Sequence, residues 1–180
     1  MTNQLPLNHV YNLGRLGSAG DAVSFSADAE QRAAIAKWSG VLSLESFVVA
    51  VDIKKLGATH FRLEFQVTAD VTQACVVTLE PVPAHMETRF VRELHFTGQA
   101  RRKKSEDESV ADLVLDAAEE EGPEEIESLH YDLAGPALEE YVLGLEPYPR
   151  APGVAFQPPR DGLEAPESPF AVLKGLKPGL

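Results

Sequence analysis

The residues able to do covalent or metal chemistry are few in this chain. Cys75 is the single cysteine. A reactive thiolate needs an electropositive and accessible setting, whereas Cys75 stands in an apolar run beside Val76 and Val77, so we expect it to be buried and structural. The histidines do not show the H-E-x-x-H spacing of a zinc helix, and they are dispersed as His9, His60, His85, His95 and His130.

Clustered carboxylates and glycines offer no stronger signal. The run Glu119 to Glu121, with Glu124 and Glu125, could gather a divalent cation weakly, but it lacks the Gly and Asx pattern of a calcium loop. An enzyme would require a cryptic carboxylate site in which acids such as Glu64 or Glu80 carry perturbed pKa values. The sequence therefore predicts no catalytic residue, no cofactor, no metal ion and no small-molecule substrate.

The elements that position these residues follow from hydrophobic periodicity. Helical spacing predicts helices over 26–38 and 136–145, with Ser26 as N-cap, Gly40 as terminator and Pro136 at the first helical position. Between them lie strand-like runs at 44–53, 61–68, 73–79 and 86–96 without intervening helices. This order predicts an α+β fold with an antiparallel sheet of about five strands and two main helices.

Two strand runs differ in character. Residues 61–68 alternate strictly, with Phe61, Leu63, Phe65 and Val67 on one face, as expected for a sheet with one buried face. The run 74–79 is apolar on both faces, which predicts a central strand ended by the prolines at 81 and 83. We expect one domain over 1–150, with a mobile acidic loop at 101–125, and a Pro-rich extension over 151–180.

Charge is segregated along the chain. Residues 105–149 hold fifteen Asp and Glu and no Lys or Arg, while the remainder holds 13 acids and 16 bases. Such segregation indicates a surface that meets positive charge or mimics a polyanion. We expect Glu119, Glu120, Glu121, Glu124 and Glu125 to bind a basic partner.

A basic run just before this block supports an alternative. Arg101, Arg102, Lys103 and Lys104 could contact phosphate, together with a basic sheet edge formed by Arg62, Arg89 and Arg92. The acidic loop would then mimic RNA. Salt dependence with bare RNA separates the two hypotheses, because phosphate contacts give a steep slope.

Compartment signals are plain. The sequence has no apolar stretch near 18 residues and no secretory signal at its start, so we expect a cytoplasmic location and no membrane partner.

Three motifs resemble a known family. They are the strand pair at 71–81 (VTQACVVTLEP), the helix and Pro-rich exit at 138–149 (LEEYVLGLEPYP), and the tail at 168–177 (SPFAVLKGLK). In order and spacing they are similar to the YceD family of bacteria and plastids, whose members are described as large-subunit ribosomal RNA accumulation proteins. The resemblance runs from about the first helix to the C-terminus.

The chain departs from the family pattern at its cysteines. Many members carry C-x-x-C in the central strand pair and a further cysteine after the Pro-rich exit. Here Cys75 matches the first, Thr78 stands at the second, and residues 154–157 offer no third. A metal held by those family cysteines would therefore have no equivalent site here.

The resemblance implies a bacterial accessory factor in ribosome biogenesis, and it carries no catalytic residues. A basic ribosomal protein or a ribosomal precursor particle suits the acidic block as partner, and direct RNA contact is the alternative. The tail is expected either to dock on the domain or to present a peptide to a partner, and the residues that form this motif are Pro169, Phe170, Leu173, Lys174, Leu176 and Lys177.

Overall fold

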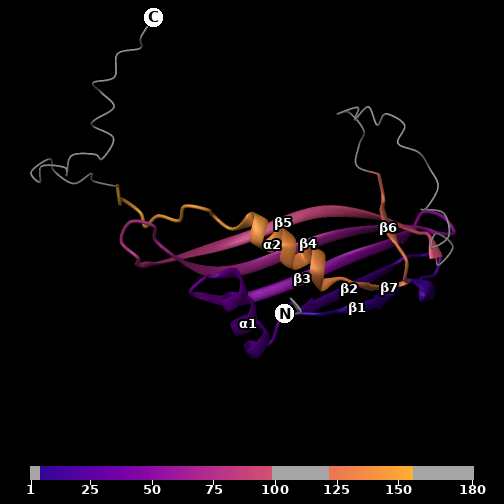
Figure 1. Ribbon diagram of the computed structural model, residues 1–180, viewed down its shortest axis with the longest axis horizontal. Helices are drawn as coiled ribbons and strands as arrows, with labels where there is room; N and C mark the ends of the chain where they lie inside the picture. Colours follow the sequence, from indigo (N-terminus) through magenta and orange to yellow (C-terminus); the bar gives the residue numbers. More distant parts are fainter. Residues whose placement is uncertain (1–4, 99–121, 156–180) are drawn as a thin grey trace, which may run out of the picture.

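The computed structural model of the protein describes residues 5–98 and 122–155. Long strands dominate, and they are joined by short turns (Figure 1). In chain order the elements are β1 (Val10–Asn12), η1 (Leu13–Arg15), β2 (Asp21–Ser26), α1 (Ala29–Ser39), β3 (Ser43–Lys55), β4 (His60–Ala74), β5 (Pro81–Phe96), β6 (Glu124–Ile126), β7 (His130–Asp132) and α2 (Ala134–Gly144).

The main sheet is mixed, not purely antiparallel as predicted. Its strand order is β2-β3-β4-β5-β6, and β1 and β7 form a separate two-stranded sheet. Strands β2 to β5 pair antiparallel, but β6 pairs parallel with β5 between Leu94 and Phe96. Short turns force antiparallel neighbours, whereas the long connection 97–123 lets the chain return in the same direction. The α+β class, the two helices and the five-stranded sheet are as predicted.

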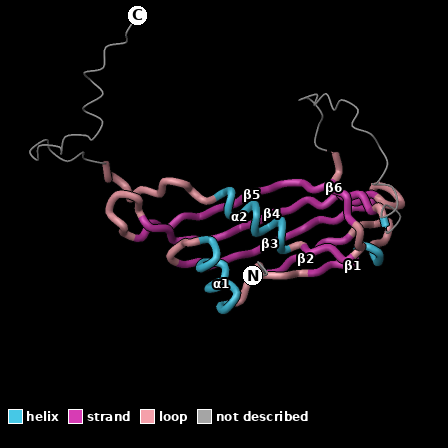
Figure 2. Tube along the Cα trace, in the orientation of Figure 1, coloured by secondary structure: helices cyan, strands magenta, loops and turns pink. Residues whose placement is uncertain are grey.

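One face of the sheet is buried and carries the core. The predicted alternation in β4 is confirmed, since Phe61, Leu63, Phe65 and Val67 are all buried. Both helices lie on this face, and α2 crosses the middle strands in Figure 2. The buried Tyr141 ring of α2 meets Phe47 of β3 edge-to-face, with ring centroids 5.6 Å apart.

The opposite face of the main sheet has polar and charged side chains from every long strand. Asp52 of β3 lies opposite Glu64 of β4, and Gln66 of β4 lies opposite Arg89 of β5. Side chains directly opposite in an antiparallel pair share a face. This open face is therefore a charge mosaic over β3, β4 and β5.

The helices begin at different residues from those predicted. Asp28, not Ser26, caps α1. Its carboxylate accepts from the Gln31 backbone N–H at 2.8 Å, and the Gln31 side-chain oxygen accepts from the Asp28 backbone N–H. Ser26 is held in β2, which pairs with β3. Helix α2 begins two residues before Pro136 because the Asp132 side chain accepts from the Ala134 N–H at 3.0 Å. Gly40 ends α1 in the left-handed conformation, as expected.

The predicted central strand at 73–79 is wrong. Strand β4 runs on to Ala74, residues 75–80 form the turn of a hairpin, and β5 begins at Pro81. Pro81 and Pro83 are tolerated inside β5 because that strand is the sheet edge there, with β6 pairing only at Leu94 to Phe96. The apolar run therefore marks the end of a hairpin, where Cys75 is buried.

Candidate partner-binding surfaces

The acidic block is only partly within the described residues. Glu119, Glu120 and Glu121 lie outside them. Glu124 and Glu125 lie in β6, whereas the sequence placed them in the loop. Both are exposed. Glu124 accepts a 3.3 Å hydrogen bond from the Tyr131 hydroxyl. Burial of Tyr131, followed by the negative charge of Glu124, raises the pKa of this tyrosine.

The three sheet arginines of the RNA hypothesis do not form one basic edge. Arg62 and Arg89 lie on the open face, whereas Arg92 lies opposite the buried Leu63 and so belongs to the helix-covered face. Each contacts a carboxylate: Arg62 pairs with Glu64 and Glu93 at 3.3 Å, Arg89 with Glu87 at 2.9 Å, and Arg92 with Glu139 of α2 at 3.3 Å. The residues 101–104 of the basic run lie outside the described residues.

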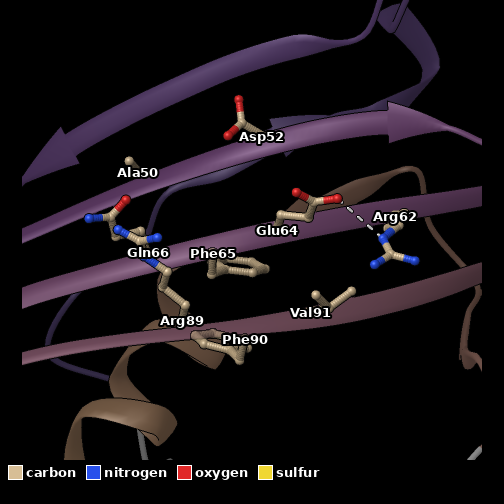
Figure 3. Close-up of a pocket in the computed structure, with 9 residues that line it drawn as sticks. All are labelled: Ala50, Asp52, Arg62, Glu64, Phe65, Gln66, Arg89, Phe90 and Val91. Carbon is tan, nitrogen blue, oxygen red and sulfur yellow. Dashed lines mark ion pairs between the residues drawn. The ribbon is translucent and has the colours of Figure 1, made fainter.

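A shallow hollow on the open face collects several of these side chains (Figure 3). Arg62 and Glu64 point toward each other across it, with Asp52 on the neighbouring strand. A hydrogen bond from Lys54, then its charge and that of Arg62, lower the pKa of Glu64. A general acid needs a raised pKa, so Glu64 sits in the wrong environment for that role.

Ser46, Asp70 and His85 meet at the other end of the open face. The Ser46 hydroxyl donates to Asp70 at 2.6 Å, and His85 Nδ1 lies 2.7 Å from the other Asp70 oxygen. The hydrogen bond from Ser46, followed by that from His85, lowers the pKa of Asp70. The Ser46 hydroxyl thus faces a carboxylate whose lowered pKa makes it a weak base, and the His85 imidazole contacts Asp70 instead of the hydroxyl, so the trio lacks the serine–histidine contact of an activated nucleophile.

The buried Cys75 thiol joins the β4–β5 hairpin to the chain that follows α2. The Ala151 N–H donates to Cys75 Sγ at 3.4 Å. The Val76 N–H donates to the Pro149 carbonyl at 2.9 Å, and the Gln73 side chain donates to the Glu146 carbonyl at 3.0 Å. These contacts hold residues 145–151, here termed the strap, against the end of the hairpin.

Hydrogen bonds in this turn set the acidity of the thiol. The Thr78 side chain is the largest cause, followed by backbone N–H groups of Ala151, Thr78 and Val77, and together they lower the pKa of Cys75 to about 6 against the opposing effect of burial. Burial of Cys75 was predicted and is confirmed. Its interactions are those of a hydrogen-bonded structural residue.

Leu79 closes the same turn in an unusual conformation. Its φ is 62°, and among the described residues no other non-glycine residue has a positive φ. Its N–H donates to the Cys75 carbonyl at 2.9 Å, which completes the turn. The left-handed conformation costs a side chain about 1 kcal/mol relative to glycine. Despite this cost, Leu79 is 77% exposed, so little of it packs against the described domain.

Further apolar side chains are exposed at this end of the sheet. Val76 of the hairpin and Tyr148 of the strap are 47% and 69% exposed. With Leu79 they form the hairpin-end patch, on two segments joined by the Val76–Pro149 hydrogen bond. Sequence reasoning missed this patch because it assigned 73–79 to a central strand. The signal that was available is the pair of prolines at 81 and 83, which fit an edge strand following a turn.

Two further observations concern metals and membranes. Across 5–98 and 122–155, no three or more His, Cys, Asp or Glu side chains gather closely enough to hold a metal ion. Neither of the described helices is long and apolar enough to cross a membrane. The tail residues 169–177 lie outside the described part of the chain.

Fold and surfaces together define a small α+β protein with a helix-covered sheet face, an open charged face and an apolar patch at one end. The family model of the large ribosomal RNA subunit accumulation protein YceD matches residues 63–177, from β4 to the tail motif. The chain therefore belongs to the YceD family, as its motifs predicted. No curated protein and no solved structure matches the chain.

Proposed function

We propose that the protein is a non-catalytic accessory factor in ribosome biogenesis, which binds a basic ribosomal protein or a precursor particle through its acidic segment. The family to which it belongs is named for the accumulation of large-subunit ribosomal RNA. The observation that carries the mechanism is the charge segregation, with fifteen acids and no Lys or Arg over 105–149.

The described part of this block supports the proposal through its exposure. Glu124 and Glu125 are exposed on β6, and Glu139 is exposed on α2 although it pairs with Arg92. Attraction between such a surface and a basic partner accelerates encounter and weakens with salt. Of the RNA alternative's arginines, Arg62, Arg89 and Arg92 are already paired with carboxylates on two different faces of the sheet, so phosphate would have to compete for these three.

The test is the association rate with a basic large-subunit ribosomal protein. Replacing Glu119, Glu120, Glu121, Glu124 and Glu125 with Gln should slow association about ten-fold at low ionic strength. The difference should shrink as salt shortens the screening length to about 8 Å at physiological ionic strength. A control with the same charge change elsewhere carries Glu30→Gln, Asp52→Asn, Glu80→Gln, Glu164→Gln and Glu167→Gln.

Three outcomes would contradict the proposal. Equal rates for the parent and the acidic-segment variant would make the segment a solubilising insertion. Tight binding of bare large-subunit RNA, with a steep salt slope that is lost when residues 101–104 are neutralised, would favour the direct RNA-binding alternative. Partner binding that depends on a chemical turnover would identify an enzyme instead.

A further inference from the structure

We propose that the hairpin-end patch of Val76, Leu79 and Tyr148 is the docking site for this chain's own C-terminal segment, residues 169–177. The inference goes beyond the ribosomal role and does not depend on it. The hairpin and the strap lie at the end of the sheet opposite β6 and β7 (Figure 1).

The strained turn points to a use for the Leu79 side chain. Its backbone adopts the left-handed conformation, in which glycine would avoid the steric penalty. A leucine retained there would normally be explained by packing, but the side chain is 77% exposed among the described residues. Strained residues cluster at sites where a ligand or partner binds. A bound apolar segment would give Leu79 the contacts that the domain does not.

The surroundings of the patch favour a basic occupant. Glu80 follows Leu79 directly, and Glu146 lies in the strap two residues before Tyr148. The nearby carboxyl end of α2 has no basic residue in its last turn, and helix carboxyl ends attract cations. Arg150 is the strap's base, so acids outnumber bases around the apolar centre.

The tail has the complementary chemistry. Residues 169–177 contain two lysines, Lys174 and Lys177, and no acid. The larger apolar residues of the same segment are Phe170, Val172, Leu173 and Leu176. An apolar segment with flanking positive charge matches an apolar patch with flanking carboxylates better than a random partner would.

Chain connectivity brings this segment to the patch. The strap ends with Ala151 hydrogen-bonded to Cys75 Sγ, so the chain leaves the described domain beside the hairpin. Thirteen residues, 156–168, separate the described chain from the tail. Fully extended, that length reaches about 40 Å. A tether of this kind gives an effective concentration on the order of millimolar, enough for a weak site to be filled.

The experiment uses the full chain and a lysine-specific endoprotease, which cleaves after Lys174 and finds no lysine in the linker 156–168. Release of peptide 175–180, followed by mass spectrometry, reports the fraction of undocked tail. A variant with Leu79→Asp and Tyr148→Asp should release the peptide about five-fold faster than the parent, as expected if four-fifths of the tails are docked. Leu56→Asp, at an exposed leucine in the β3–β4 turn, is the matched control and should leave the rate unchanged.

Backbone amide NMR signals give a second measurement, in which the substitutions lie in the tail and the domain is not altered. Replacing Leu173 and Leu176 with Asp in the full chain should shift the signals of Leu79 and Tyr148 and leave that of Leu56 in place. Unchanged signals, or equal peptide release from the parent and the patch variant, would overturn the proposal. Release that slows with rising protein concentration would place the tail on a second copy and would also overturn it.

Discussion

The backbone N–H of Ala151 donates a hydrogen bond to Cys75 Sγ over 3.4 Å, across 76 positions of sequence. This contact fixes the chain leaving α2 to the turn between β4 and β5. In the same turn the Thr78 hydroxyl donates to the Glu80 carboxylate at 3.2 Å, and the Thr78 side chain is the largest cause of the lowered pKa of Cys75. The hydrogen bonds from Ala151 to Cys75 and from Val76 to Pro149 thus join the turn and the strap.

The first prediction concerns Cys75 as an acceptor. Cys75→Ala should leave the Ala151 N–H without its partner and open a small cavity. We expect the urea midpoint of unfolding to fall by about 0.5 M, with partner binding intact. Cys75→Ser keeps an acceptor and should lose less. Stoichiometric zinc in the parent, absent from Cys75→Ala, would contradict this structural role.

A second prediction follows from the acidity of the thiol. The Thr78 hydrogen bond and the turn N–H groups lower the pKa of Cys75 from 9.0 to about 6. Because the folded pKa lies below the unfolded one, the stability gained from the thiolate is complete above about pH 9, declines as the pH falls and is lost below about pH 6. Ultraviolet absorbance of the thiolate should therefore titrate near pH 6 in the native protein, and the stability gap between parent and Cys75→Ala should widen from pH 6 to pH 9. Titration at or above pH 9 would disprove it.

The third prediction concerns the start of α1. Asp28 accepts from the Gln31 N–H at 2.8 Å in a capping box. Asp28→Ala should lower the free energy of unfolding by about 1 kcal/mol, because an orphan helix N–H loses its acceptor. Asp28→Ser, which keeps a capping oxygen, should stay within a few tenths of the parent. Equal losses for both substitutions, measured by chemical denaturation, would rule out capping as the cause.

The local periodicity of apolar residues was enough to predict most of the fold. The alternation over 61–68 correctly placed Phe61 and Leu63 in the core, because one buried face imposes a period of two on its strand. Gly40 likewise ended α1 as expected, since its positive φ suits glycine. These features depend on neighbours in sequence, so they can be deduced from the sequence alone.

The predictions were wrong where the structure depends on contacts between segments that are distant in sequence. The parallel pairing of β6 with β5 joins Leu94 to Glu124 across a long connection, and no local pattern encodes that direction. The neutralisation of Arg92 depends on Glu139 of α2, which only the packing of helix on sheet brings to 3.3 Å. The turn at Cys75 was mistaken for a strand because its apolar residues face the strap and solvent instead of two sheet neighbours.

The last prediction tests how α2 is held on the sheet. Tyr141 is fully buried, and its ring meets Phe47 at an interplanar angle of 85°. Its hydroxyl lies 3.5 Å from Ser39 Oγ, at the limit of hydrogen bonding. Tyr141→Ala should therefore lower the free energy of unfolding by about 3–5 kcal/mol, because it removes a buried aromatic ring and leaves a cavity.

Tyr141→Phe is the matched control for this substitution. It keeps the ring and deletes only the hydroxyl, so the loss should stay within about 1 kcal/mol. Urea denaturation followed by circular dichroism measures both variants. A small effect of Tyr141→Ala would mean that α2 does not depend on the Phe47 contact. A large effect of Tyr141→Phe would assign the stability to the hydroxyl at Ser39 instead of to the ring.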